Sequence, residues 1–431
     1  MTPAERVRDP VLIVGSGLPA AAVARAVATA GLRAVLVDER EPVREGGGEG
    51  LWYAPWWPGG EPPIVQLTEA GIDRLEAVYR ESGEGFSANR RGRLIVTGRP
   101  ELARLLRSMA GRQAALGHGP LREHTTTDWY LPSPPDGFRG VPDGFDLLEG
   151  AGLRSAFPFL DPGMVLGVHV RRAGWVDARA LRRWLIGAIR EAGGVVVSEP
   201  VRGIEFTGDG WRITTVSGAR LSGPTLVLAG SRVRSLGRLA GFELPWADYT
   251  RLVGVLAGGA RAMPGSCPMI AADLDGWGAV GPAGELGAEA AWGLPSLLAD
   301  GDGGLRLEAA MPGVPAAAEV GRLGEALLER LGQAVATLRS YRGPPGGLEV
   351  AAYPMPLAPD LRPAIGMADR RGGFVVAGVG MTVGLVLGAA DLLAAYLAGA
   401  PLPGYAPAFV PGRFGPLSLR PPDGTTSRVD F

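Results

Sequence analysis

The residues with the clearest chemical capacity lie near the start of the chain, in the segment VLIVGSGLPA at positions 11–20. Four apolar residues, typical of a strand buried on both faces, precede Gly15. Gly15 permits a tight turn, Gly17 lets the backbone approach a pyrophosphate, and the small Ala20 permits close packing of helix on strand. Such a turn favours an anion at a helix N-terminus. The alternative is a strand, turn and helix with a close-packed glycine and no ligand.

A second strand, residues 35–38, ends in Asp38, whose carboxylate can accept hydrogen bonds from the ribose of a dinucleotide. A strand, a glycine turn and a helix return near the other end of the chain, over residues 373–398, with Gly378 and Gly380 in the turn. Because the pattern occurs at both ends, we expect the chain to leave a nucleotide-binding domain and to come back to complete it.

Aromatic side chains gather in the segment after the second strand, at Trp52, Trp56 and Trp57. The glycine run 46–48 before them allows close backbone approach, and flat rings offer a large contact surface. The segment could therefore wrap a cofactor ring or roof a substrate. An aromatic plug in a domain interface is an equally good interpretation.

Composition narrows the classes of function. A net charge of −1 gives no electrostatic basis for binding nucleic acid or an anionic membrane. The single cysteine, Cys267, excludes an intramolecular disulfide, and the three histidines have no metal-ligand spacing. We find neither a membrane-spanning apolar run nor a cleavable leader pattern, so we expect a cytoplasmic location. All 43 basic residues are arginine, which excludes a catalytic lysine.

Hydrophobic periodicity predicts alternating helices and strands between the two glycine turns. Helices are expected near residues 20–30, 65–83, 101–115, 178–192, 318–338 and 389–398, and strands near 92–97, 195–201, 225–230, 251–256 and 304–308, with a hairpin over 203–216. Residues 117–145, rich in Pro, Gly, Asp and Thr, predict an exposed loop. Residues 235–345 predict a separate sheet-and-helix domain.

Four sequence blocks, taken in order, resemble the FAD-dependent oxidoreductases of the D-amino-acid oxidase, glycine oxidase and sarcosine oxidase family. The blocks are the first glycine turn with Asp38, AGWVDARAL at 173–181, the hairpin and strand over 200–230, and PDLRPAIG at 359–366 with the strand into Gly378 and PGRF at 411–414. Each block is loose by itself, and their shared order over nearly the whole chain carries the resemblance.

The resemblance implies an α/β fold with a Rossmann-like, discontinuous FAD-binding domain and a mixed or antiparallel β-sheet substrate domain with helices. The implied boundaries are 1–60, 160–232 and 350–400 for the FAD-binding domain, 61–159 and 233–349 for the substrate domain, and 401–431 for an extended C-terminal tail. The implied chemistry is removal of a hydride from the carbon next to an amine nitrogen onto flavin N5, which leaves an imine. The partner is then a small-molecule amine or amino acid, and the oligomeric state stays open.

The residues that the resemblance assigns to FAD lie on glycine turns or at the strand ends beside them. They are Gly15, Gly17, Ala20, Asp38, Glu39, Arg44, Gly47, Gly48, Val201, Ala229, Gly230, Gly378, Gly380, Met381, Thr382 and Val383. Val201 is expected near the adenine. Gly378, Gly380 and Thr382 are expected beside the isoalloxazine carbonyls, where backbone N–H groups stabilise negative charge on the reduced ring.

The chain departs from the family pattern where substrate would bind. Met355 stands where relatives that oxidise free amino acids carry an arginine for the substrate carboxylate. Tyr353 stands where sarcosine oxidases carry a cysteine bonded to flavin, so we expect non-covalent FAD. Leu385 lies near the place of a lysine that helps oxygen react. We therefore expect a larger and more apolar or aromatic amine than glycine, as in a specialised biosynthetic pathway, and sluggish or differently managed use of oxygen.

The expected catalytic residues are Tyr353, Met355, Arg251 and Thr382, and the expected substrate-pocket residues are Trp52, Trp56, Trp57 and Tyr249. Arg251 could hold a carboxylate or the flavin pyrimidine edge, and a surface arginine is an equal alternative. Core packing is an equal alternative for Tyr353 and Met355. Arg362 could replace the missing clamp, but a solvated arginine is the better interpretation. His169, on an alternating strand, is better read as a structural histidine.

Two other functions stay open from the sequence. An NAD(P)-dependent dehydrogenase could use the same glycine turn. An FAD-binding subunit without turnover of its own would fit the missing arginine and lysine.

Overall fold

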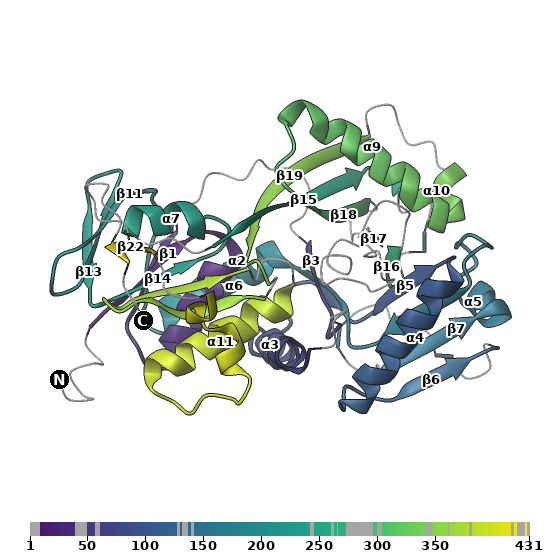
Figure 1. Cartoon of the computed structure of the whole chain (residues 1–431), viewed down its shortest axis with the longest axis horizontal. Helices are drawn as coiled ribbons and strands as arrows, with labels where there is room; N and C mark the ends of the chain where they lie inside the picture. Colours follow the sequence, from purple (N-terminus) through teal and green to yellow (C-terminus); the bar gives the residue numbers. More distant parts are fainter. Residues whose placement is uncertain are drawn as a thin grey trace.

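The computed structural model describes residues 9–38, 50–56, 61–126, 130–131, 137–138, 142–241, 245–259, 263–264, 266–272, 296–299, 304–340, 347–360, 362–378, 382–414, 418–419 and 427–428. Two sheets dominate the described part of the chain, one of six strands and one of nine. In Figure 1, the six-stranded sheet lies with helices α2 and α11 at one end of the molecule, and the nine-stranded sheet lies with α4 and α9 at the other. The short strand β3 runs between them.

The six-stranded sheet has the order β10-β2-β1-β14-β21-β20. Its strands are β1 (Val11–Gly15), β2 (Ala34–Asp38), β10 (Val195–Val197), β14 (Thr225–Ala229), β20 (Ala364–Asp369) and β21 (Gly373–Ala377). All neighbours pair in parallel except β20, which pairs with β21 in the antiparallel sense. The almost continuous apolar runs of the central strands fit burial on both faces. A sheet assembled from such distant segments confirms the predicted Rossmann-like α/β fold.

Helices cover one face of this sheet and a small sheet covers the other. The helices are α2 (Gly17–Thr29), α6 (Ala178–Glu191) and α11 (Val383–Ala398), which share a core with Ile13 and Val227. The opposite face is covered by β11 (Val201–Phe206), β12 (Trp211–Thr215), β13 (Arg220–Gly223) and α7 (Val233–Ala240). This arrangement leaves the carboxyl edge of the parallel strands as the place where turns and helix N-termini meet.

Helix α3 (Pro62–Glu81) packs on α11 through glycines. A Cβ at Gly71 would lie 1.8 Å from the carbonyl oxygen of Gly384, and a Cβ at Gly388 would lie 2.3 Å from the carbonyl oxygen of Leu67. A side chain at either position would therefore push the two helices apart. Helix α11, which also contacts α2, is held on two sides with its N-terminus at the sheet edge.

The nine-stranded sheet has the order β19-β15-β18-β17-β16-β5-β8-β7-β6. Its strands are β5 (Arg93–Thr97), β6 (Leu121–His124), β7 (Phe145–Glu149), β8 (Leu166–Val170), β15 (Ala247–Leu256), β16 (Met269–Ala272), β17 (Ser296–Ala299), β18 (Leu305–Pro312) and β19 (Leu348–Leu357). Most neighbours are antiparallel, whereas β16–β5 and β6–β7 are parallel, so the predicted mixed sheet is confirmed.

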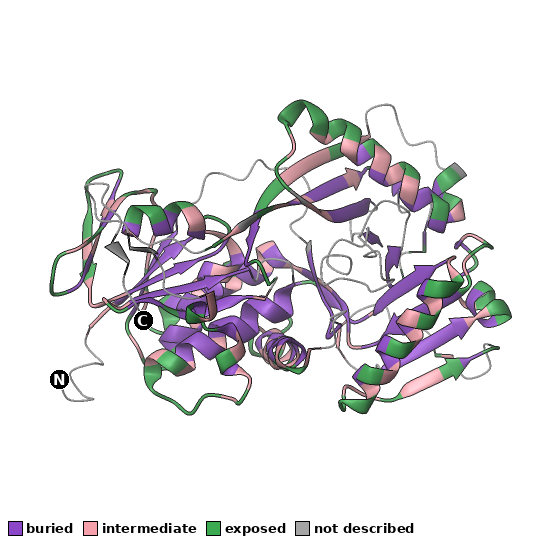
Figure 2. Cartoon of the chain, viewed as in Figure 1, coloured by how far each residue is buried: buried purple, intermediate pink, exposed green. Residues whose placement is uncertain are grey.

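The two faces of the nine-stranded sheet differ in what covers them. The outer face packs under α5 (Gly150–Ala156), α9 (Ala317–Ala334) and α10 (Ala336–Ser340) in a core with Leu94 and Leu307. The opposite face, here called the inner face, carries α4 (Pro100–Ala115), Trp52 and Ile95. Figure 2 shows both sheets as largely buried and the outward faces of α4 and α9 as exposed.

A small sheet joins the two parts of the molecule. Its strands are β3 (Gly50–Tyr53), β4 (Ala88–Asn89) and β9 (Gly174–Asp177), with β9 in the centre. Trp52 lies directly opposite Trp175 in the β3–β9 pair. The hydroxyl of Tyr53, a fully buried residue, donates to the carbonyl oxygen of Asn89 at 2.7 Å. The predicted aromatic segment is thus partly a strand.

Three predicted elements differ from the structure. Helix α11 begins at Val383 rather than near residue 389, because Thr382 caps it and its apolar first turns are buried. The helix predicted over 318–338 divides at Val335, which has extended backbone, into α9 and α10. Part of the loop predicted over 117–145 forms β6, and His124 on this strand is buried.

The described part of the C-terminal segment contains short turns, where we predicted an extended tail. Two 3₁₀ turns span Ala406–Phe409 and Pro411–Phe414, and the pairs Ser418–Leu419 and Ser427–Arg428 form a two-stranded ladder. The proposed domain boundaries stay a prediction. Strand β8 belongs to the nine-stranded sheet, and α3 packs on α11 beside the six-stranded sheet.

Candidate active site

The first glycine turn forms at the carboxyl end of β1 as the sequence predicts. A Cβ at Gly15 would lie 2.0 Å from the carbonyl oxygen of Ala229, so only glycine fits beside β14. Gly17 has φ +77°, a left-handed conformation that favours glycine, and a Cβ there would meet only the Pro19 ring, at 3.7 Å, among the described residues. The turn places Ala20 in the core against Gly15.

The first turn of α2 itself carries no group that would compete with an anion. Ser16 at the N-cap makes no side-chain hydrogen bond to the helix, and the first turn contains no acidic residue. The first amides of a helix have no partner within it, and they favour negative charge. The turn therefore fits the diphosphate of a dinucleotide.

Asp38 lies level with Gly15 in the register of β1 and β2. Its carboxylate forms an ion pair with Arg182 of α6, and both side chains are 6% exposed. The Nε atom of Arg182 is buried and has no hydrogen-bond partner among the described residues. The sequence predicted Asp38 at this edge but gave no signal for Arg182, which lies 144 positions away.

Two further turns meet at the same edge, after β14 and after β21. Gly230, at φ +97°, packs where a Cβ would lie 2.9 Å from the carbonyl oxygen of Ser16. Gly378, at φ +71°, follows β21. Thr382 is the N-cap of α11, and its hydroxyl accepts a hydrogen bond from the Leu385 amide at 3.2 Å. The structure thus brings two helix N-termini, those of α2 and α11, to one sheet edge.

The expected catalytic residues of β15 and β19 lie on the inner face. Tyr353 pairs with Arg251, and Met355 pairs with Tyr249, in the β15–β19 register. Met355 is 6% exposed and belongs to the core that includes α11, whereas Tyr353 is 44% exposed. Tyr249 packs against the same core as Met355. The inner face therefore reaches the nucleotide-binding edge at Met355.

Arg251 is engaged by a carboxylate that the sequence analysis missed. Its Nη2 donates to Glu308 Oε1 at 2.7 Å, and Arg306 Nε donates to the same oxygen at 2.6 Å. Burial raises the pKa of Glu308, but the charges of Arg251 and Arg306 outweigh burial and hold the pKa below its ordinary value. Glu308 is thus ionised at neutral pH, and its ion pair with Arg251 competes with any anionic ligand for that guanidinium.

Arg93 is a second residue that the sequence analysis missed. It begins β5 on the inner face, is 2% exposed, and has its guanidinium carbon 4.3 Å from the centroid of the Trp52 ring. Burial lowers the pKa of Arg93 to about 10, and the charge of Glu308 partly opposes this shift. The sequence did hold a signal for this residue. In the strand RLIVT at 93–97, Arg93 is two positions before the apolar Ile95, so both side chains point to the same, buried face.

Other candidates take structural positions. Trp56 is buried with its ring centroid 5.9 Å from that of Phe145, which fits the aromatic-plug interpretation. Arg362 Nε donates to Glu61 Oε2 at 2.8 Å, so this arginine is already engaged by a carboxylate and is not available to bind a substrate carboxylate. Val201 begins β11, on the face of the six-stranded sheet away from α2.

His169 belongs to a buried polar cluster on the outer face. Its Nδ1 lies 3.1 Å from the Tyr130 hydroxyl and its Nε2 lies 2.9 Å from the carbonyl oxygen of Arg91. Burial and the charge of Arg171 lower the pKa of His169 to about 3, so the ring is neutral. Its structural interpretation is consistent with these contacts.

Seven predicted site residues lie outside the described residues, so their placement carries no argument. They are Glu39, Arg44, Gly47, Gly48, Trp57, Gly380 and Met381.

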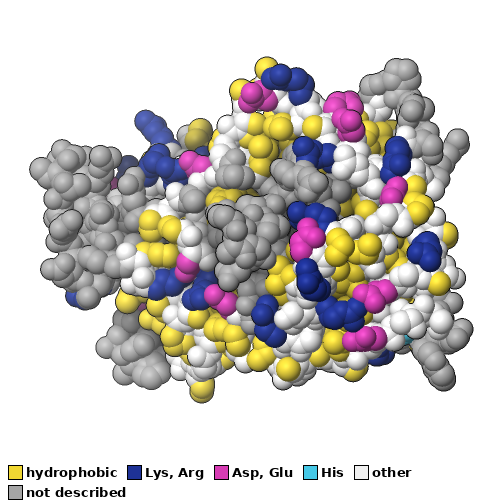
Figure 3. Space-filling model, turned by 45° about the vertical axis from the view of Figure 1, so that its right-hand side comes forward, with side chains coloured by type: hydrophobic (Ala, Val, Ile, Leu, Met, Phe, Trp, Pro, Cys, Tyr) yellow, Lys and Arg dark blue, Asp and Glu magenta, His cyan; other side chains and the backbone are white. Residues whose placement is uncertain are grey.

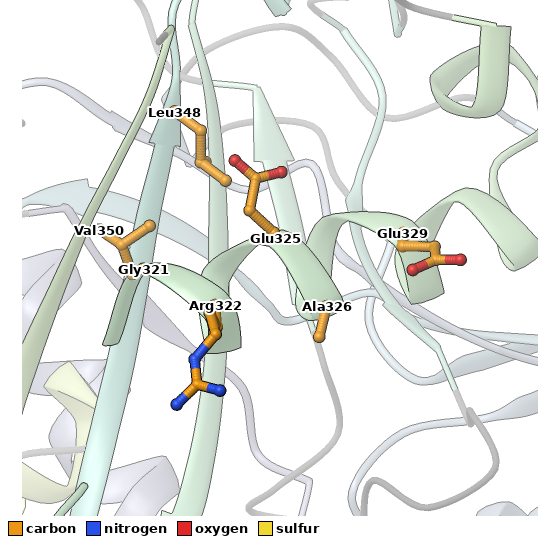
Figure 4. A pocket seen from close by; sticks show the side chains of 7 residues that line it. All are labelled: Gly321, Arg322, Glu325, Ala326, Glu329, Leu348 and Val350. Atoms are coloured by element: carbon orange, nitrogen blue, oxygen red, sulfur yellow. The ribbon is translucent and has the colours of Figure 1, made fainter. Parts of the chain in front are cut away.

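Away from the inner face, an open hollow of about 540 Å³ lies between α9 and β19, lined by Arg322, Glu325, Glu329 and apolar residues of β19 (Figure 4). On the face drawn in Figure 3, arginine and acidic side chains lie interspersed, with no gathering of one charge.

No helix among the described residues is long and apolar enough to cross a membrane. In the same part of the chain, no group of His, Cys, Asp and Glu side chains could hold a metal ion.

Comparisons with known proteins give a family from the sequence and a fold from solved structures. The family described as FAD dependent oxidoreductase matches residues 10–396. The L-proline dehydrogenase of P. horikoshii superposes with a TM-score of 0.71 at 15% identity, over 94% of this chain and 97% of that chain. The iminodiacetate oxidase of Chelativorans sp. BNC1 gives 0.66 at 18% identity, over 93% and 98%. The glycine oxidase of Geobacillus kaustophilus gives 0.66 at 18%, over 91% and 95%.

No curated protein sequence matches this chain. At 15–18% identity the superpositions show a shared fold alone, whereas the family match spans residues 10–396. The family match also decides against the NAD(P)-dependent dehydrogenase that the sequence left open as an alternative. The glycine cradle, the two helix N-termini and the family match agree, and the chain therefore belongs to the DAO family of FAD-dependent oxidoreductases.

Proposed function

We propose that this protein oxidises an amine or amino acid larger and more apolar than glycine. A hydride leaves the carbon next to nitrogen and a proton leaves the nitrogen, so the product is an imine. FAD, when bound, supplies the acceptor of the hydride and its two electrons. The similar structures bear the names of enzymes for L-proline, iminodiacetate and glycine, all of which are amines that carry a carboxylate.

One observation carries the proposal: the inner face ends at the nucleotide-binding edge. Met355 of β19 shares a core with Val376 of β21 and Leu385 of α11. The inner-face side chains at this end of β19 and β15 therefore adjoin the nucleotide-binding edge. A substrate on this face would lie between the sheet and the end of α11. Trp52 and Tyr353 lie on the same face, and Tyr353, which is exposed, supplies aromatic surface that a larger amine could contact.

The residues of this face align the amine and exclude water, and they offer no histidine base. His124 and His169 belong to the outer-face cluster, and His118 lies 2.8 Å from Glu69. Hydride transfer from a neutral amine requires alignment more than proton abstraction from carbon. We propose that Met355 and Tyr353 contact the reacting end of the substrate, with the first amides of α11 beside the flavin.

We also propose that FAD is held without a covalent bond. Tyr353 replaces the cysteine of sarcosine oxidases, and Cys267, the single cysteine, is buried in the outer-face core. Burial raises the pKa of the Cys267 thiol to about 12, which disfavours the nucleophilic thiolate. Acid precipitation should leave all flavin in the supernatant, and yellow protein in the pellet would contradict the proposal.

Anaerobic mixing of the purified holoenzyme with a panel of amines tests the function directly. The panel should include glycine, L-proline, and primary and secondary amines with aromatic side chains. We expect the flavin absorbance to bleach with at least one larger amine and not with glycine. An unbleached flavin throughout the panel would favour the non-catalytic FAD-binding subunit, and glycine as the best substrate would contradict the proposed substrate class.

A further inference from the structure

One buried arginine on the inner face has no carboxylate partner among the described residues, unlike the other buried arginines. Among the described residues, Arg90, Arg171, Arg182 and Arg306 are buried, and each forms an ion pair with a carboxylate. Arg93 is equally buried, yet it forms neither a hydrogen bond nor an ion pair through its guanidinium in that part of the chain, and its Nε is an unpartnered buried atom. A buried cation without an anion is unfavourable, so such a group is rarely kept without a use.

The described neighbours of Arg93 form no ion pair with it. Glu308, the carboxylate whose charge acts on it, already accepts hydrogen bonds from Arg251 and Arg306. The guanidinium carbon of Arg93 lies over the Trp52 ring, and this contact offsets part of the desolvation. Glu308 therefore acts on Arg93 only through its charge and forms no ion pair with it.

A second unpartnered donor lies beside the same stack. Trp175 stands opposite Trp52 in the β3–β9 pair, so their side chains share a face, and its Nε1 is buried without a hydrogen-bond partner among the described residues. Strand β3 also contacts α11, so this cluster adjoins the helix whose N-terminus lies at the nucleotide-binding edge. Buried tryptophan N–H groups ordinarily find an acceptor.

We propose that Arg93, stacked on Trp52, is the residue that binds the carboxylate of the substrate. The proposal rests on the proposed function, since it takes the inner face as the substrate side. It moves anion recognition to β5, away from the position of Met355, where the family pattern has an arginine. A carboxylate matches the planar guanidinium fork, which can donate two parallel hydrogen bonds.

Anion binding can be measured without turnover. Isothermal titration calorimetry of the oxidised holoenzyme should compare acetate, phenylacetate, indole-3-acetate and succinate, and should compare the two aromatic acids with their uncharged amides. We expect at least one carboxylate to bind at least about tenfold more tightly than its amide, because charge-assisted hydrogen bonds exceed neutral ones by that order. Equal affinity of acid and amide, or no binding of any acid, would overturn the proposal.

Variants then assign the binding to the guanidinium. R93Q should weaken the best carboxylate about 10- to 100-fold and leave its amide unchanged, and R93K should lose less than R93Q because it keeps the charge and loses the fork. R322Q on α9 is the matched control, since Arg322 is 79% exposed on the outer side, and it should bind as the wild type does. Normal carboxylate affinity in R93Q would contradict the assignment.

Folding and function can be separated from this result. Circular dichroism and flavin content identify variants that fail to fold, and the acid–amide comparison in the wild type stands without any variant. If carboxylates bind through Arg93 but no amine bleaches the flavin, the proposed function fails and the anion site remains. If amines bleach the flavin and R93Q binds carboxylates normally, the function stands and this inference fails.

Discussion

Two buried arginines mark the two ends of the site, and they differ in what balances their charge. Arg182 lies at the nucleotide end and is paired with Asp38 of β2. Arg93 lies on the inner face, stacked on Trp52, without an ion pair to any described residue. The first charge is balanced by the chain itself, and we propose that the second is balanced by what binds. Among the described residues, the charge of Arg182 is therefore balanced, whereas the charge of Arg93 is not.

A third region shows that pairing is the ordinary arrangement in this molecule. Arg171 on the outer face is 1% exposed and forms an ion pair with Asp146, which also accepts from Arg122 at 2.6 Å and lies 2.8 Å from His124 Nε2. Burial raises the pKa of Asp146, but these neighbours outweigh it and hold the pKa far below its ordinary value. The outer face thus encloses charge within a satisfied network.

The largest expected effect comes from closing the glycine cradle at the nucleotide end. Gly15→Val would place Cβ 2.0 Å from the carbonyl oxygen of Ala229, a backbone atom that cannot move without breaking β14 from β1. We expect a loss of more than about 4 kcal/mol of unfolding free energy, and loss of bound FAD. Urea unfolding and flavin absorbance per protein measure both.

Gly187→Ala is the control for this cradle, because Gly187 is a half-buried residue of α6 where a Cβ would meet nothing within 4 Å. It should keep FAD and change stability by no more than about 1 kcal/mol, in the stabilising direction. A Gly15→Val protein that retains FAD would show that the turn does not hold the cofactor.

The next largest effect tests the paired arginine. Arg182→Met leaves Asp38 buried without its cation, which should lower the free energy of unfolding by about 3–5 kcal/mol. The double variant Asp38→Leu with Arg182→Met removes both charges and should recover part of this loss. A double-mutant cycle by urea unfolding gives the coupling. Additive losses would mean that the pair does not act as one unit.

The local pattern of the chain was enough to predict the nucleotide end. The apolar run before Gly15 and the acid at Asp38 are both set by short-range rules for a strand, a turn and a strand end. The partner of Asp38 could not be predicted, because Arg182 is 144 positions away and sits on an amphipathic helix with several arginines. Only the packing of α6 against the sheet selects it.

The substrate end was harder to predict for a different reason. In LRLEA at 305–309, Arg306 and Glu308 alternate with leucines, a pattern typical of a strand with one solvated face. In the structure both are buried, because the inner face is turned toward the rest of the protein. The sequence therefore suggested Arg251 as a ligand-binding arginine. It did not predict that Glu308 would be buried beside Arg251 and accept a hydrogen bond from it.

The outer-face network predicts a moderate effect of pH. The pKa of His169 falls to about 3 in the folded protein, from an ordinary value of about 6.5, so the unfolded chain binds more protons in between. Stability is full above pH 6.5 and is lost as pH falls toward 3. Between pH 6.5 and 5 we expect a loss of up to about 2 kcal/mol.

His169→Gln removes this titration and keeps a donor for the carbonyl oxygen of Arg91. Urea unfolding at pH 6.5 and 5 should show a smaller difference for the variant than for the wild type. The lowered pKa of Asp146 makes stability depend on pH mainly below the ordinary aspartate pKa of about 3.9, which is outside the interval from pH 6.5 to 5. Parallel pH profiles for the two proteins would show that His169 is not the group responsible.

The smallest expected effect is the sharpest test of the comparison. Arg93→Met removes a buried charge that no described carboxylate balances and keeps an unbranched apolar side chain beside Trp52. The relief from desolvation and the lost stacking oppose each other, so the free energy of unfolding of the substrate-free holoenzyme should change by less than about 1 kcal/mol. Arg182→Met, measured alongside by urea unfolding, should cost several times more. A loss in Arg93→Met as large as in Arg182→Met would mean that Arg93 is held for the fold, and the distinction between a chain-balanced and a ligand-balanced arginine would then disappear.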